Sequence, residues 1–322
     1  MKKIVVGCPS YRFTGGPTLA HQLCAELSNQ GFESSMYYYN VSDKKKVQHP
    51  NYTNFNLKYT TELQDDENTI FIAPETNPDM LRSIKKGKKV IWWMSVDNYF
   101  DKYLTSRRNK ILNIGGLLKF NIDRKDTFHF AQSQYAIEFL ENRGIDKKKI
   151  FYVSDYLDDI FIENSSKHVS VNKNDVILYS PKRGFELTNL LIKKIPEVKW
   201  IPLQDLTQKE MISLMQSSKL FVDFGNHPGK DRIPREAVIN GCCIITGSQG
   251  SAKNDIDINI LREFKFEESN IKIDEIVNKI LNILENYNAN YELLKDYRKK
   301  IMSEHQKFID DVSNAFDILK KI

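Results

Sequence analysis

Short apolar runs alternate with helix-like segments along the first half of the chain. Runs of aliphatic and aromatic residues predict strands at residues 3–6, 35–39, 69–73, 89–94 and 128–133. Apolar positions at helical spacing predict helices at residues 18–29, 80–86 and 134–142. Strands that alternate with helices are typical of a parallel sheet covered by helices on both faces.

The second half repeats this pattern after a polar interruption at residues 154–175. Strands are predicted at residues 176–179, 198–202, 220–224 and 242–246, and helices at residues 185–194, 207–217 and 234–240. Thr207 and Glu210 form a capping box at the start of one of these helices, and the chain is mostly amphipathic helix from residue 271 onward. We therefore expect an α/β protein with two doubly wound, Rossmann-like domains at residues 1–160 and 161–300, followed by a C-terminal helix at 301–322.

Composition supports a folded protein and narrows its partners. Charged residues make up 28% of the 322 residues and hydrophobic ones 41%, which excludes a disordered chain. The net charge of +5 suits an anionic ligand but is too small to indicate nucleic acid. The four cysteines lack the spacing of a metal site or a disulfide framework, and no apolar span reaches the ~20 residues of a membrane helix. These features predict a cytoplasmic protein.

The loop at residues 223–236 is the strongest candidate for chemistry. It joins a predicted strand to a predicted helix, and the free N–H groups and dipole at a helix N-terminus attract anions. Lys230, Arg232 and Arg235 add positive charge that suits a diphosphate. Glu236 projects near the same place, where a carboxylate accepts hydrogen bonds from the two hydroxyls of a ribose. The alternative is a solvated loop in which Arg235 and Glu236 pair with neighbouring side chains.

Two more strand-to-helix loops are candidates, and their signals are weaker. Lys182 and Arg183 form a basic pair in the loop at residues 179–186. The competing interpretation is an ordinary basic turn at the surface. Gly15 and Gly16 lie in the first loop, at residues 11–17, which lacks the G-x-G-x-x-G pattern of a dinucleotide site. Here a tight turn that requires glycine is an equally good interpretation.

The stretch REAVINGCCIITG, with the strand and glycine-containing loop before it, resembles the donor site of GT-B glycosyltransferases of the family 4 type. The resemblance implies that Glu236 binds the ribose and that the preceding backbone amides bind the phosphates. It also implies that Lys182 and Arg183 hold the leaving diphosphate and that the Gly15-Gly16 loop faces the donor. Many retaining members carry a glutamate where this chain has Pro228, so Asn226 and His227 are considered as substitute sugar or phosphate contacts.

The resemblance implies two facing Rossmann-like domains with a cleft between them, and a C-terminal helix that packs back on the N-terminal domain. The implied activity is transfer of a sugar from a nucleotide donor to a glycan or lipid-linked acceptor in bacterial surface-polysaccharide biosynthesis. No cofactor or metal is implied, and UDP is the commonest nucleotide of such donors. A sugar-nucleotide epimerase of the same fold and a non-catalytic nucleotide-sugar-binding partner stay open as alternatives.

On the acceptor side, Glu75 and Asp97 follow predicted strands, and either could serve as the base that deprotonates an acceptor hydroxyl. Helix capping or a structural hydrogen bond is the competing interpretation for each. Asp255 and Asp257 have the D-x-D form of a metal-dependent donor site but follow no clear strand. Basic runs at residues 44–46, 85–89, 107–110 and 147–149 are solvated surface by default, and contact with the inner face of the plasma membrane is a weaker hypothesis.

Overall fold

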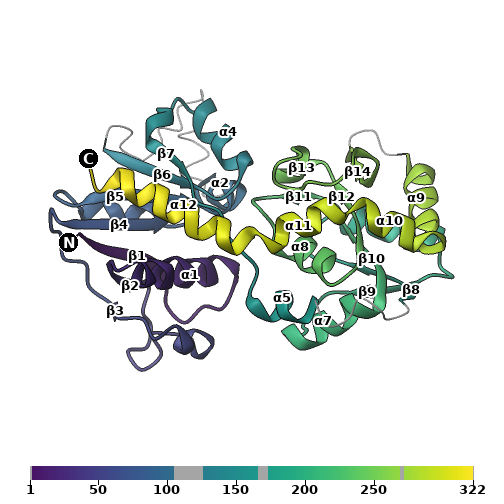
Figure 1. Ribbon diagram of the computed structural model, residues 1–322, viewed down its shortest axis with the longest axis horizontal. Helices are drawn as coiled ribbons and strands as arrows, with labels where there is room; N and C mark the ends of the chain where they lie inside the picture. Colours follow the sequence, from purple (N-terminus) through teal and green to yellow (C-terminus); the bar gives the residue numbers. More distant parts are fainter. Residues whose placement is uncertain (1, 105–125, 166–172, 269–271, 322) are drawn as a thin grey trace. The chain divides into compact units, whose positions relative to one another are not determined.

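The computed structural model describes residues 2–104, 126–165, 173–268 and 272–321. It divides into two compact units, of which unit 1 comprises Met1–Asp155 with Gln306–Ile322 and unit 2 comprises Tyr156–His305 (Figure 1). The sequence placed the corresponding boundaries at 160/161 and 300/301. The basic run at residues 107–110 lies outside the described residues.

Unit 1 is built on a parallel sheet that has seven strands within the described residues, in the order β3-β2-β1-β4-β5-β6-β7. The strands are β1 (Lys3–Pro9), β2 (Glu33–Tyr39), β3 (Tyr59–Thr60), β4 (Thr69–Pro74), β5 (Lys88–Trp93), β6 (Thr127–Ala131) and β7 (Ile150–Tyr152). Strand β4 is buried at every position, as its continuous apolar sequence requires of a central strand covered on both faces. The direction of the strand order reverses between β1 and β4, which makes that point the expected ligand crevice of this sheet.

The described helices of unit 1 follow the strands. They are α1 (Gly15–Asn29), η1 (Pro50–Phe55), η2 (Pro78–Ser83), α2 (Val96–Leu104), α4 (Gln134–Asn142), η3 (Lys147–Lys149) and most of α12 (Glu304–Leu319). The helix predicted at residues 80–86 is wrong in type and extent, because it is the short 3-10 helix η2. Asp65 explains the early stop, since its carboxylate accepts hydrogen bonds from the backbone N–H groups of Lys85, Lys86 and Gly87.

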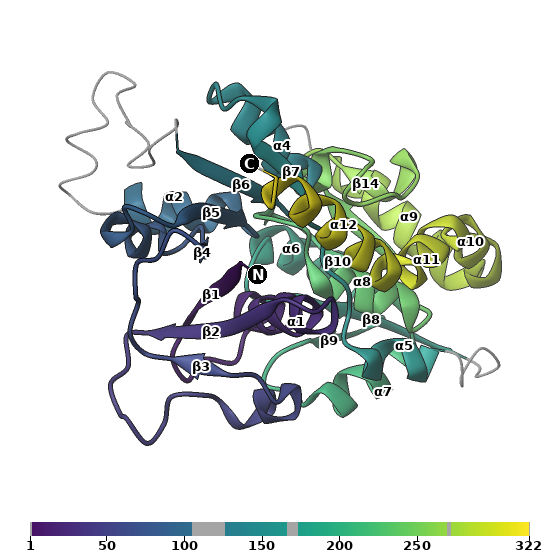
Figure 2. The same cartoon turned by 60° about the vertical axis from the view of Figure 1, so that its left-hand side comes forward.

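Helix α12 lies against the sheet of unit 1 (Figures 1 and 2). The ring of Phe316 packs 5.3 Å from that of Phe32 and 5.7 Å from that of Phe130 on β6. Asp311 accepts hydrogen bonds from the hydroxyl and the backbone N–H of Ser154, at 2.6 and 3.2 Å. Aromatic packing and one buried polar contact therefore hold the end of the chain in unit 1.

Unit 2 has a parallel sheet of five strands within residues 173–268, in the order β14-β12-β10-β8-β9. The strands are β8 (Asn174–Tyr179), β9 (Lys199–Pro202), β10 (Ser218–Asp223), β12 (Cys243–Gly247) and β14 (Lys265–Phe266). The helices described here are α5 (Asp159–Ser165), α6 (Phe185–Lys194), α7 (Gln208–Ser217), α8 (Arg232–Ile239), α9 (Ile273–Glu285), α10 (Tyr287–Leu293) and α11 (Lys295–Met302). Both halves of the predicted capping box of Thr207 and Glu210 are formed at the start of α7.

The strand order of unit 2 reverses between β8 and β10. Helix α6 follows β8 and leads outward to β9, whereas α8 follows β10 and leads in the other direction to β12. In a right-handed doubly wound sheet these two helices lie on opposite faces, and a crevice opens where they diverge, beyond the carboxyl ends of β8 and β10. The fold thus places the loops after these two strands at the expected ligand site of unit 2.

Candidate ligand site of unit 2

Two glycines let the loops after β8 and β10 come together at this point. Gly184 and Gly225 both have positive φ angles, of 59° and 91°, which favour glycine. A Cβ atom on Gly184 would clash with the backbone of Phe224, and one on Gly225 would lie 2.8 Å from the backbone nitrogen of Gly184. The loops are therefore fixed by direct backbone contact, and no other residue fits at position 184 without moving them.

Arg183 ties the two loops together through carboxylates. Its Nε and one terminal nitrogen donate to the two carboxylate oxygens of Asp223, at 3.0 and 2.7 Å. Its other terminal nitrogen donates to Asp231 at 2.7 Å and to the backbone oxygen of Asn226 at 3.2 Å. In the described structure these contacts use four of the five guanidinium N–H groups, so Arg183 keeps one donor for a ligand. The role of Arg183 in holding a diphosphate stays a prediction, and only one N–H group is left for it.

His227 completes this charged cluster beneath the loop. Its Nδ1 lies 2.7 Å from Asp231 Oδ2, and its Nε2 lies 3.2 Å from the backbone oxygen of Asp223. Burial alone lowers the pKa of His227, but the hydrogen bond to Asp231 and the charge of Asp223 outweigh it and raise the pKa above its usual value. The imidazole is buried, so it positions the loop and does not reach a ligand in this conformation.

Asp223, His227 and Asp231 bring three possible metal-ligand atoms within 4.8 Å of one another. The guanidinium of Arg183 is bound to both of these carboxylates. A cation is thus already supplied by the protein, which explains why two acids share one small volume.

Lys230 and Arg235 form a second buried cluster with Glu304, the first residue of α12. Lys230 Nζ lies 2.8 Å from Glu304 Oε1, and a terminal nitrogen of Arg235 lies 2.6 Å from Oε2. Arg235 also donates to the backbone oxygens of Asp231 and Lys230. The side chain of Arg235 is 0% exposed, so it holds the loop from behind and cannot touch a diphosphate without rearranging.

A third cluster joins Arg232 to two acids. Its Nε lies 3.5 Å from Glu236 Oε1, and a terminal nitrogen lies 3.0 Å from Asp158. Glu236 is 5% exposed, and burial raises the pKa of its carboxyl, partly offset by Arg232 and Arg235. The pairing that the sequence left open for Arg235 and Glu236 is therefore present. The ribose contact of Glu236 stays a prediction.

The backbone around the loop is also tied down. The Gly225 N–H donates to the carboxylate of Glu268. Asn226 and His227 form the short strand β11, which pairs in parallel with β13 (Gln249–Gly250) after β12. Asn226 is exposed, and its role toward a sugar stays a prediction. Lys182 is exposed and, in the part of the chain that the structure describes, makes no ion pair. Lys182 is thus the cation most available to an anionic ligand.

The remaining predicted site residues lie in unit 1 or have other partners. Gly15 begins α1, and Gly16 has no positive φ and would meet only Met94, at 3.8 Å, if it carried a Cβ. The tight-turn interpretation of Gly16 is thus not supported. Glu75, buried at the end of β4, accepts a hydrogen bond from the Met94 N–H at 3.2 Å. Asp97, in the first turn of α2, accepts one from the Tyr135 hydroxyl at 3.0 Å. Both acids have the structural contacts of the competing interpretation, and their roles as bases stay predictions.

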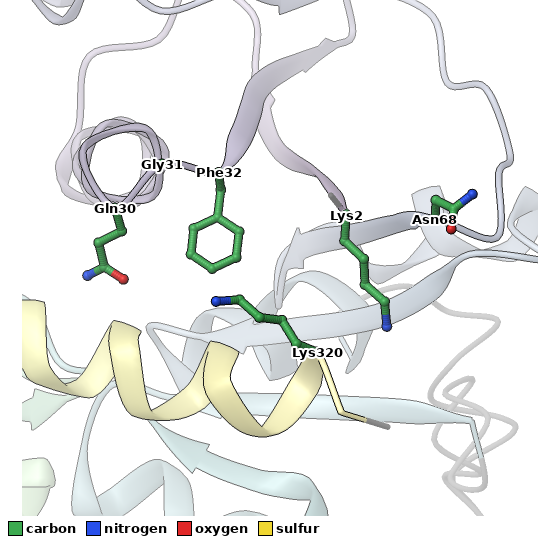
Figure 3. A pocket seen from close by; sticks show the side chains of 6 residues that line it. All are labelled: Lys2, Gln30, Gly31, Phe32, Asn68 and Lys320. Carbon is green, nitrogen blue, oxygen red and sulfur yellow. The ribbon is translucent and has the colours of Figure 1, made fainter.

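The D-x-D motif has its own partners. Asp255 pairs with Lys265 at 2.8 Å, and Asp257 accepts a hydrogen bond of 2.8 Å from the Asn254 side chain. A hollow of about 460 Å³ lies elsewhere, lined by Lys2, Gln30, Gly31, Phe32, Asn68 and Lys320 (Figure 3). Lys2 and Asn68 immediately precede β1 and β4, so this hollow lies at the amino edge of the sheet of unit 1. Ligands of open α/β sheets bind at the opposite edge.

The sequence interpretation missed the acids that hold the cations. Asp223 and Asp231 stand four residues either side of His227, and that spacing could have revealed the cluster. Asp158 and Glu304 lie far from the loop in sequence, and nothing local marks them. Among the described residues no helix meets the length and apolarity needed to cross a bilayer.

Comparisons with known proteins bear on the fold. No family model and no curated protein sequence matches this chain. Solved structures do match. Anabaena HepE, solved in complex with UDP-glucose, has 11% identity and a TM-score of 0.65, with both chains covered completely. Sucrose-phosphate synthase from Thermosynechococcus elongatus has 11% identity and a TM-score of 0.67, again over both whole chains. The lipopolysaccharide outer core galactosyltransferase WaaB has 13% identity and a TM-score of 0.61 over both whole chains. The predicted GT-B fold, with its two Rossmann-like units, is thereby confirmed.

Proposed function

We propose that this protein is a glycosyltransferase that moves a sugar from a nucleotide donor, with UDP the first candidate, to a glycan or lipid-linked acceptor. The observation that carries the proposal is the site at the reversal point of the second sheet. There, Gly184 and Gly225 bring two backbone loops together beside exposed Lys182 and the N-terminus of α8. Such a site binds phosphates through amide N–H groups and the helix dipole.

The similar structures support the same reading. HepE was solved with UDP-glucose, and WaaB is a galactosyltransferase of the lipopolysaccharide outer core. Assembly of a bacterial surface polysaccharide is therefore the process in which we place the protein. The basic runs of unit 1 remain candidates for contact with a membrane that presents the acceptor.

Nucleotide binding is tested first, by thermal shift against UDP, GDP, ADP, CMP and TDP. A ligand that binds only the folded state stabilises it by ~2.7 kcal/mol at a hundredfold excess over its dissociation constant. We expect UDP to give the largest shift. Lys182→Ala should reduce it, whereas Lys199→Ala, an exposed lysine at the amino end of β9 in the same unit, should not. Failure of all five nucleotides to shift the transition would refute the proposal.

The ribose contact is tested with 2′-deoxy-UDP. If Glu236 accepts a hydrogen bond from the 2′-hydroxyl, the wild-type protein binds UDP more tightly than the deoxy analogue. Glu236→Ala should weaken UDP binding and abolish this difference, because the two changes remove the same interaction. If both proteins prefer UDP over the deoxy analogue by the same factor, Glu236 does not contact the ribose and only pairs with Arg232.

Turnover of UDP-glucose distinguishes a transferase from an epimerase and from a non-catalytic binding partner. A transferase releases UDP from UDP-glucose slowly in water and faster when an acceptor is added. An epimerase instead converts the donor into another nucleotide sugar without an acceptor. A non-catalytic partner binds UDP and shows no turnover in either assay.

A further inference from the structure

An exposed group of aromatic side chains lies in unit 1, at the carboxyl ends of β1 and β2. Tyr11 and Phe13 are 41% and 44% exposed. The ring of His49 lies 5.2 Å from that of Tyr11 and stacks at 5.3 Å and 15° on that of Phe13. We call Tyr11, Phe13 and His49 the aromatic platform. Among the described residues of unit 1, the other strongly exposed aromatic ring is Tyr59, on β3.

The loops that carry the platform are locked to each other. The backbone N–H of Ser10 donates to Tyr39 at 2.9 Å, and that of Tyr11 donates to Val47 at 2.9 Å. The Ser10 hydroxyl also donates to the Val47 oxygen at 3.0 Å. Tyr11 has a φ of 53°, in the left-handed region that a bulky residue rarely adopts. Strain of this kind persists where surrounding contacts enforce it, and it gathers at ligand sites.

A buried layer supports the platform from below. The Phe13 ring lies 5.6 Å from that of Tyr52, which stacks at 3.8 Å on His21. Because the Pro17 oxygen can only accept, His21 Nδ1 donates to it at 2.7 Å and Nε2 accepts from the Tyr38 hydroxyl at 2.7 Å. The rings beneath the surface are therefore fixed, and a ligand that stacks on the exposed rings would order little that is not already ordered.

The chemistry and place of the platform indicate its ligand. A pyranose ring presents a face of C–H groups that packs on aromatic rings, while its hydroxyls stay at the wetter rim. Arg12, which stands between Tyr11 and Phe13 in the sequence, is exposed, and Lys46 Nζ lies 5.9 Å above the Tyr11 ring, so cations border the platform. The exposed rings favour a cyclic sugar with a flat C–H face, which an acyclic polyol phosphate lacks. The loop after β1 also borders the point where the strand order of this sheet reverses, where ligands of such sheets bind.

We propose that the aromatic platform is an acceptor subsite that stacks on a pyranose ring of a glycan. The inference rests on the proposed function, because it assigns the acceptor of the transfer reaction to a particular class. It predicts that the acceptor is a pyranose-containing saccharide and that Tyr11 and Phe13 contribute most of the stacking surface.

An array of immobilised pyranose oligosaccharides, with poly(glycerol phosphate) included, tests this directly. We expect the wild-type protein to bind pyranose glycans. In Tyr11→Ala/Phe13→Ala the apparent dissociation constant should rise by about tenfold or more. The control Tyr59→Ala removes a ring of the same unit that is 53% exposed and should bind like the wild type. Tyr11→Gly serves if the double variant does not fold, because glycine suits the positive φ at this position while the ring is lost.

Three outcomes overturn the proposal: equal binding by the wild type and a correctly folded platform variant, binding of poly(glycerol phosphate) only, or binding of no pyranose glycan by the wild type. UDP thermal shifts on the same preparations report on unit 2 independently. A wild-type protein without a UDP shift refutes the proposed function. A normal UDP shift with unchanged glycan binding in the variants refutes the platform alone.

Discussion

The carboxyl ends of the two sheets present their side chains in opposite ways. In unit 2 the loops carry Arg183, Lys230, Arg232 and Arg235, and each of these cations is paired with a carboxylate. In unit 1 the corresponding loop presents exposed aromatic rings. A cation count taken from sequence therefore overstates the charge offered to a ligand. In unit 2, charges position the backbone, and the proposed nucleotide recognition falls to amides and the few uncommitted side chains.

The buried histidines show the same contrast. In unit 1, burial lowers the pKa of His21 to about 4 and that of His129 to about 3, so both are neutral in the folded protein near pH 7. In unit 2, His227 sits between two aspartates that raise its pKa. Protonation of these histidines therefore destabilises the first unit and stabilises the second.

The largest expected effect comes from Glu304→Ala. This change leaves Lys230 and Arg235 buried without their shared carboxylate, and removal of one partner from a buried ion pair costs about 3–5 kcal/mol of unfolding free energy. Urea denaturation measures it. Glu263→Ala is the control, because its pair with Lys279 leaves the Glu263 side chain 52% exposed and such pairs contribute ~0–1 kcal/mol. Equal losses in the two variants would show that the buried cluster has no special role.

The Glu304 effect has a further check. Replacing the whole cluster by apolar residues, as in Lys230→Met/Arg235→Met/Glu304→Leu, should recover much of the stability, since buried ion clusters are often no more stabilising than apolar packing. If stability returns while the triple variant binds UDP more weakly than the wild type does, the cluster serves to position the loop.

The glycines at the two reversal points come next. Gly184→Ala should destabilise unit 2 by about 2–4 kcal/mol, because the new methyl group meets the Phe224 backbone and the φ is positive. Gly16→Ala should change stability by less than about 1 kcal/mol, since the position is helical and has room. Thermal denaturation of both variants measures the two changes in stability. A tolerated alanine at 184 would mean that the two loops are not held in contact.

Periodicity alone predicted most of the fold. Alternating strands and helices specified two parallel sheets, and the capping box marked the start of α7. The 3-10 helix η2 escaped prediction because its end depends on Asp65, which is remote from it in sequence. Which loops meet at the candidate site was also predictable, since the topology places the loops after β8 and β10 side by side. The partners of the cations were not, because Glu304 reaches Arg235 across 69 residues of chain.

Acid should lower the stability of unit 1 through its buried histidines. The pKa of His21 is lower in the folded state than the usual 6.5, so its contribution to stability is complete above pH 6.5 and is lost as pH falls toward 4. For this single group the loss at pH 5 is about 2 kcal/mol relative to pH 7.5. Tryptophan fluorescence in a Trp200→Phe background follows unit 1 through Trp92 and Trp93. His21→Phe should reduce the difference between the two pH values by about this amount, with His129 supplying a further part, and an unchanged difference would assign the acid sensitivity to other groups.

His227 should show the opposite dependence with a smaller effect. Because its folded-state pKa is raised, its added stability is complete below pH 6.5 and disappears as pH rises through the folded-state value. His227→Gln should therefore cost about 1 kcal/mol at pH 6 and less at pH 8.5. Hydrogen exchange of peptides from β10 and α8, compared with the wild type at each pH, confines the measurement to unit 2. In an Asp231→Asn background, where the partner carboxylate is gone, the same substitution should show little pH dependence. A cost that grows toward high pH would mean that His227 is held neutral, as the histidines of unit 1 are.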